Sequence, residues 1–110
     1  MKNVLPFIFL AVPAMADDAS VEQVSYQSGR FSVTLSHPDS GWDDYADGWR
    51  VELADGTVLG TRVLVHPHVD EQPFTRSSSI SVPNGVTEVF IRASTNTGGW
   101  ANSTTRYRLR

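Results

Sequence analysis

The sequence contains no cysteine among its 110 residues, and both of its methionines lie within the first sixteen residues. Without cysteine the chain cannot form disulfide bonds, even in an oxidising compartment. Residues 17–110 therefore also lack the thiolate and thioether groups that build soft Cu(I) sites. A folded domain made of these residues must depend on its apolar core.

Lysine is almost as scarce, because Lys2 is the only one in the chain. When Lys2 is left out of the whole chain's formal net charge of −3, residues 17–110 carry a charge of −4. Such an acidic domain has no basic patch for nucleic acid, so nucleic acid is not expected as a partner. The sequence also lacks Gly-x-Ser-x-Gly or another nucleophile motif, and we expect no enzyme.

The first sixteen residues have the features of a secretory signal peptide. Lys2 precedes an apolar run at residues 4–11, and Ala14-Met15-Ala16 resembles a small-residue cleavage site. The apolar run is far shorter than the roughly twenty residues that a bilayer-spanning helix needs. No cysteine follows it to carry a lipid. We therefore predict a signal peptide at residues 1–16 and one periplasmic or secreted domain at residues 17–110, without a membrane span.

Apolar and polar side chains alternate in short runs along residues 17–110, as in half-buried β-strands. The clearest run places Phe31, Val33 and Leu35 on one face. Turns that contain glycine separate several of the runs, for example at Asp55-Gly56. The predicted strands cover residues 21–26, 31–36, 49–53, 57–65 and 79–82, the residues around Val89 and Ile91, and residues 102–109.

Seven short strands with regularly spaced turns predict an all-β fold, an antiparallel seven-stranded β-sandwich of the immunoglobulin or fibronectin III type. Successive connections in such a sandwich fall at alternating ends. The three longer loops, at residues 37–48, 66–74 and 94–101, should therefore meet at one end, which we call the loop pole. Loops that are held by rigid sheets often carry binding residues, so we predict that function lies there.

Aromatic, cationic and acidic side chains are concentrated in the predicted loop pole. Tryptophan, tyrosine and arginine dominate the hot spots of protein interfaces. We therefore predict a non-enzymatic binding module whose protein partner contacts Trp42, Asp43, Tyr45, Arg76 and Trp100. Two alternatives remain for the aromatic rings. They can stack on sugar rings, or they can fold over the end of the sandwich and seal its core.

All three histidines also fall in the predicted loop pole. His66 and His68 are two residues apart, so in an extended backbone they project in the same direction, and imidazole binds Zn²⁺ and Cu²⁺ well. With His37 as a third ligand and Asp70 or Glu71 bonded to the rings, they form a candidate metal site. The alternative is that the histidines pack the loops and the two carboxylates pair with surface arginines. No other cofactor is predicted.

Four aspartates occur within residues 39–47. Carboxylate oxygens are typical Ca²⁺ ligands, although the spacing is not that of an EF-hand. Aspartates also stabilise turns by bonding to their own backbone. Acid–base catalysis by Asp43 or Asp44 is not expected, because the sequence gives neither residue the apolar surroundings of a catalytic carboxylate.

Two segments resemble those of a group of small exported bacterial proteins to which no activity is assigned. They are HPDSGWDDYADGWR at residues 37–50 and VHPHVDEQPFTRS at residues 65–77. The resemblance covers most of residues 17–110. It implies a periplasmic or secreted location and supplies no catalytic residue.

Overall fold

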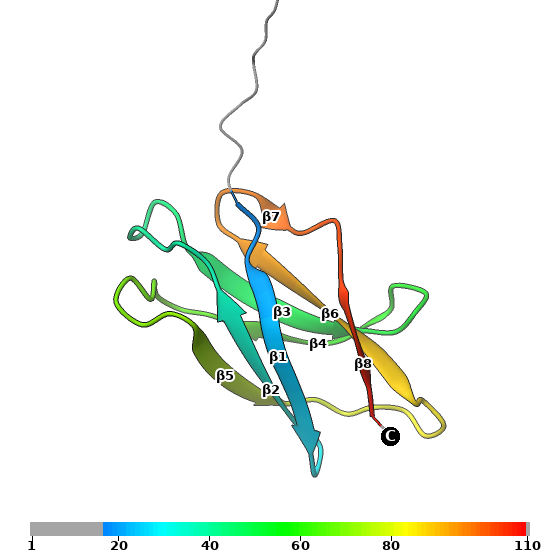
Figure 1. Ribbon diagram of the computed structural model, residues 1–110. Helices are drawn as coiled ribbons and strands as arrows, with labels where there is room; N and C mark the ends of the chain where they lie inside the picture. Colours follow the sequence, from blue (N-terminus) through cyan, green and yellow to red (C-terminus); the bar gives the residue numbers. More distant parts are fainter. Residues whose placement is uncertain (1–16, 110) are drawn as a thin grey trace, which may run out of the picture.

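The computed structural model describes residues 17–109, and the predicted signal peptide at residues 1–16 lies outside this range. Two antiparallel β-sheets face each other across an apolar core (Figure 1). The arrangement confirms the predicted all-β class and the immunoglobulin- or fibronectin III-like sandwich. Within residues 17–109 no helix is present that is long and apolar enough to cross a bilayer.

Eight strands within residues 17–109 build the two sheets. The three-stranded sheet has the order β1-β2-β5 and consists of β1 (Ser20–Gln27), β2 (Arg30–Ser36) and β5 (Phe74–Ser79). In the five-stranded sheet, β3 lies between β4 and β6, and both β7 and β8 pair with the other side of β6. This sheet consists of β3 (Ala46–Glu52), β4 (Val58–Val63), β6 (Glu88–Thr95), β7 (Gly99–Trp100) and β8 (Thr105–Arg108).

The predicted last strand, residues 102–109, is shorter in the structure, where β8 covers Thr105–Arg108, and β7 lies before it in the stretch predicted as a loop. The two residues of β7 pair with Ser94 and Thr95 at the end of β6, whereas β8 pairs with residues 88–91. The two short strands together therefore take the place of one seventh strand at the edge of the sheet. Residues 101–104 separate them.

The predicted strand at residues 79–82 was wrong in position, because β5 covers Phe74–Ser79. The side chains of β5 do not alternate between apolar and polar, as those of a strand that faces the core should. Arg76 and Ser78 pair with the inward-facing Val33 and Phe31 of β2, where apolar side chains would be expected. The strand is fixed by its hydrogen bonds to β2 and by the buried ring of Phe74.

The core contains the side chains that alternation predicts. Phe31, Val33 and Leu35 of β2 are almost completely buried. They pack in one cluster with apolar residues of β3 and β6, and the largest of these is Trp49. Fully burying a side chain of this kind contributes about 1.5–3 kcal/mol, so the cluster holds the sheets together without disulfides.

The connections divide between the two ends of the sandwich, as strand parity predicts (Figure 1). The β2–β3 loop (residues 37–45), the β4–β5 loop (residues 64–73) and the β6–β7 turn (residues 96–98) lie at one end. These three segments are the loop pole of the structure. The β1–β2, β3–β4 and β5–β6 connections lie at the other end.

Candidate functional site

The buried side chain of Asp39 joins two loops of the pole. Its Oδ1 accepts a hydrogen bond from the Ala46 amide at 3.0 Å and lies 2.6 Å from Nδ1 of His37. Its Oδ2 accepts a hydrogen bond from the His68 amide at 2.8 Å. Three donors compensate the loss of hydration of this carboxylate. Asp39 therefore fixes both ends of the β2–β3 loop and attaches them to the β4–β5 loop.

Gln72 makes a second connection between the same two loops. Its side-chain oxygen accepts a hydrogen bond from the His37 amide at 3.0 Å, and its side-chain nitrogen donates to the His68 carbonyl at 2.9 Å. The second ring nitrogen of His37, Nε2, lies 3.0 Å from the carbonyl oxygen of Asp17. His37 therefore connects the start of the described chain to the pole.

His68 is a packing residue with a fixed tautomer. Its ring is buried and stacks on Phe74, with centroids 3.8 Å apart and an interplanar angle of 10°. Nη2 of Arg76 lies 2.8 Å from Nε2 of His68. Because a guanidinium can only donate, Nε2 accepts and Nδ1 carries the hydrogen. Burial, followed by the positive charge of Arg76, lowers the pKa of His68.

The predicted three-histidine metal site is not assembled. Within residues 17–109 no three histidine, aspartate or glutamate side chains are placed to hold one ion. Both ring nitrogens of His37 face hydrogen-bond acceptors, and Nε2 of His68 accepts from Arg76. Only His66 and His68 come together, with ring centroids 4.6 Å apart. The ring nitrogens of His37 and Nε2 of His68 are therefore bonded to groups other than a metal.

The two carboxylates predicted beside this metal site are exposed. Glu71 lies 3.4 Å from Arg76, which is the surface pairing of the alternative interpretation. Asp70 is exposed in the β4–β5 loop. Neither is among the groups that contact the ring nitrogens of His37 or His68.

The low pKa of His68 predicts a loss of stability in mild acid. Since its pKa in the fold lies below the ordinary 6.5, the unfolded chain takes up the proton first. The contribution of His68 is therefore complete above about pH 6.5 and is lost as the pH falls through the pKa in the fold. Urea unfolding between pH 8 and pH 5 should show a shallower pH dependence for His68→Phe than for the unmodified chain. Equal slopes below pH 6.5 would contradict this assignment.

Trp42 projects from the β2–β3 loop, whose backbone is hydrogen-bonded to the β6–β7 turn. The indole is 66 % exposed and makes an edge contact with Tyr45, with centroids 5.7 Å apart. Asn96 of the β6–β7 turn donates to the Trp42 carbonyl at 3.0 Å and accepts from the Tyr45 amide at 2.8 Å. The neighbouring Asp43 is exposed. The exposed indole excludes the interpretation that Trp42 seals the core.

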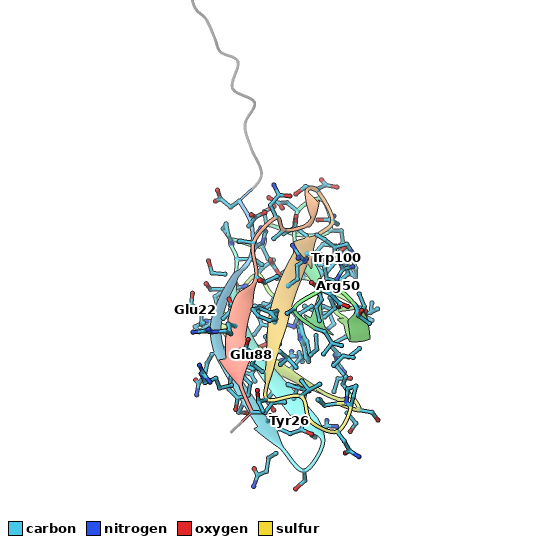
Figure 2. All side chains as sticks on the ribbon, turned by 90° about the vertical axis from the view of Figure 1, so that its right-hand side faces the viewer. Glu22, Tyr26, Arg50, Glu88 and Trp100 are labelled. Atoms are coloured by element: carbon cyan, nitrogen blue, oxygen red, sulfur yellow. The ribbon has the colours of Figure 1, made fainter. Side chains whose placement is uncertain are left out.

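Trp100 was predicted in the same group, but it belongs to a different surface. It lies in β7 opposite Ser94, and the guanidinium of Arg50 lies 4.2 Å from the centre of its ring (Figure 2). Trp100 is therefore part of the outer face of the five-stranded sheet. Arg76 was also predicted to contact the partner, but its guanidinium is hydrogen-bonded to His68 and Glu71. Of the five predicted contact residues, Trp42, Asp43 and Tyr45 remain together in one loop.

The sequence did not indicate the ion-pair cluster beside Trp100. Glu52 is 2 % exposed and accepts hydrogen bonds at 2.7 Å from Nε of Arg50 and Nε of Arg92. Arg92 also donates to the second oxygen of Glu52 at 3.1 Å and to the Ala101 carbonyl at 2.6 Å. The hydrogen bond from Arg92 lowers the pKa of Glu52, and the same bond raises that of Arg92. Alternation identified these side chains as outward-facing without placing β3 next to β6.

Replacing Glu52 should destabilise the domain. Glu52→Gln leaves two guanidinium groups without their shared carboxylate, and hydrogen bonds to charged groups contribute about 1.5–3 kcal/mol each. We expect a loss of about 2 kcal/mol in the free energy of unfolding at pH 7, measured with urea. Because the pKa of Glu52 lies below its ordinary 4.5, the difference should shrink as the pH falls below that value.

Glu88→Gln is the matched control for this substitution. Glu88 lies 3.8 Å from Arg106 in a more exposed pair, so its replacement should cost at most about 1 kcal/mol. Equal losses in the free energy of unfolding for the two variants would contradict the prediction, because the buried Glu52 cluster would then stabilise the domain no more than the exposed pair.

Comparisons with known proteins give one partial relative. No family model and no solved structure match the chain. A protein from Halomicrobium mukohataei, named "Putative lipoprotein", is 49 % identical over 88 residues. The alignment covers 76 % of this chain and 43 % of that protein. The chain therefore spans less than half the length of this relative.

Proposed function

We propose that this chain is an exported, non-enzymatic binding module that holds a protein partner at the loop pole. The observation that carries the proposal is the exposed indole of Trp42 on a loop that is fixed from below. Tryptophan is among the residues most enriched in interface hot spots. A loop that is already ordered loses little conformational entropy on binding, so more of the contact energy contributes to affinity.

Further apolar side chains are exposed on the same pole. Val65 is 71 % exposed and Val69 is 52 % exposed, both in the β4–β5 loop. Exposed carboxylates lie in the same two loops, Asp43 in the β2–β3 loop and Asp70 and Glu71 in the β4–β5 loop. Such a surface fits a partner with an apolar centre and a basic rim, because opposite charges steer the encounter.

We propose no enzymatic activity because the buried polar groups of the loop pole are hydrogen-bonded to other groups of the protein. Asp39 and His37 are bonded to each other and to backbone groups of the loops. His68 is bonded to Arg76. A group with such structural partners is poorly placed to transfer a proton to a ligand.

Export is supported by the relative and by the amino terminus. The relative is named "Putative lipoprotein", and lipoproteins are exported to the cell envelope. Residues 1–16 have the pattern of a signal peptide, although they lie outside the described structure. We therefore place the module outside the cytoplasm, in the periplasm or in the secreted fraction.

The test is retention of a partner from the envelope or secreted fraction of the source cells. A protein captured by the immobilised chain should bind Trp42→Ala at least about tenfold more weakly, since hot-spot residues contribute 2 kcal/mol or more. Trp100→Ala removes a tryptophan of the same size from the sheet face and should leave this affinity unchanged. Full retention by Trp42→Ala, or a loss confined to Trp100→Ala, would contradict the proposal.

A further inference from the structure

A groove crosses the outer face of the five-stranded sheet at the strand ends next to the loop pole. Paired residues of neighbouring strands share a face, and Trp100, Ser94, Gly48 and Val63 form one row across β7, β6, β3 and β4. Because Gly48 precedes the fully buried Trp49, this row faces outward. The groove has a volume of about 260 Å³ and lies along the row.

The floor of the groove is formed at Gly48, where neighbouring groups approach the backbone more closely than a side chain would allow. A Cβ atom at this position would lie 3.2 Å from Oγ of Ser94 and 3.6 Å from the edge of the Trp100 indole. A larger residue would therefore fill the space between the indole and Val63, which lines the other side. Val63 is itself 63 % exposed.

The indole that forms one wall is held in a fixed orientation. The Arg50 guanidinium lies over its ring at 4.2 Å, and Glu52 holds Arg50 at 2.7 Å. Trp100 lines the groove and is 37 % exposed, so part of its ring is accessible to a ligand. The cation–π contact fixes the ring while part of it stays exposed, which gives a ligand a preformed aromatic wall.

Polar side chains line the groove together with the Trp100 indole. Oδ1 of Asp47 accepts a hydrogen bond from the Ser94 hydroxyl, while Oδ2 makes no hydrogen bond within residues 17–109. The exposed Thr61, which carries a hydroxyl, also lines the groove. A ligand that fits here must therefore combine an apolar face with hydroxyl groups at its edge.

We propose that this groove binds one ring of a neutral saccharide. One face of a pyranose carries mainly C–H bonds and can stack on the exposed part of the Trp100 indole. Its hydroxyls can donate to Asp47 and exchange hydrogen bonds with Thr61. The volume is slightly below the roughly 300 Å³ at which drug-sized pockets begin, and this size suits a single ring.

The same groups select against other ligands. The carboxylate of Asp47 repels phosphorylated and acidic sugars. An aromatic peptide side chain would cover Asp47 without offering it a donor, which is costly for a buried charge. A lysine side chain would pair with Asp47 but would bring a second cation close to Arg50, so it is the competing ligand that the experiment must include.

The experiment is an NMR titration of the isotope-labelled chain. The probes are glucose, galactose, mannose, xylose and their short oligomers, with lysine and glucuronate as charged competitors. The signal of the Trp100 indole N–H, assigned by its absence from Trp100→Ala, should shift with at least one neutral saccharide. We expect a dissociation constant in the millimolar range, as for a single-ring contact.

Variants separate this groove from the loop pole. Trp100→Ala and Asp47→Ala should each weaken binding at least tenfold, whereas Trp42→Ala should leave it unchanged. Thr61→Phe fills the groove from an exposed strand position, keeps Trp100 and should also block binding. This variant decides the question if Trp100→Ala does not fold.

Three outcomes would overturn the proposal. They are the absence of any saccharide-dependent shift of the Trp100 signal, a shift caused by lysine or glucuronate instead of a neutral sugar, and saccharide binding that persists in Thr61→Phe. Retention of the protein partner depends on Trp42, so it can fail or succeed independently of these results.

Discussion

The loop pole depends on one buried carboxylate. Asp39 receives the amides of Ala46 and His68 and contacts the ring of His37, so groups from two loops converge on a single side chain. Removing it would leave two backbone donors buried without partners, each at a cost of about 1–3 kcal/mol. This constraint makes the long loops a rigid surface. Their rigidity is the property on which the proposed partner binding at Trp42 relies.

The two exposed tryptophans are supported in different ways. Trp42 belongs to the β2–β3 loop and is fastened by Asn96. Trp100 belongs to β7 and is braced by Arg50, which Glu52 holds in turn. Because Asn96 and Trp100 are only four residues apart, the β6–β7 segment serves both surfaces. The domain can therefore present a loop surface and a sheet surface from one short stretch of chain.

The sequence was sufficient to predict the features that depend on local periodicity. Alternation identified the buried side chains of β2, β3 and β6, and strand parity placed the three loops at one end. It was insufficient wherever a neighbouring strand decides the outcome. β5 was misplaced because β2 fixes it despite polar inward positions such as Arg76, and Trp100 was assigned to a loop because only two residues of β7 pair with β6.

The histidines illustrate the same limit at the level of single atoms. The spacing of His66 and His68 gave a geometry suited to a metal, but the availability of a nitrogen lone pair depends on its hydrogen-bond partner. Asp39 and Arg76 supply those partners from separate parts of the chain. The role of Asp39 was likewise missed, since its donors become neighbours only when the loops meet.

Amide hydrogen exchange tests the central role of Asp39 most directly. In the unmodified chain the amides of Ala46 and His68 should be protected, because both donate to the same buried carboxylate. In Asp39→Ala both should lose protection together, while the amide of Val51 within β3 keeps its own. Rapid exchange of either amide in the unmodified chain, or the loss of only one of them in Asp39→Ala, would contradict the account.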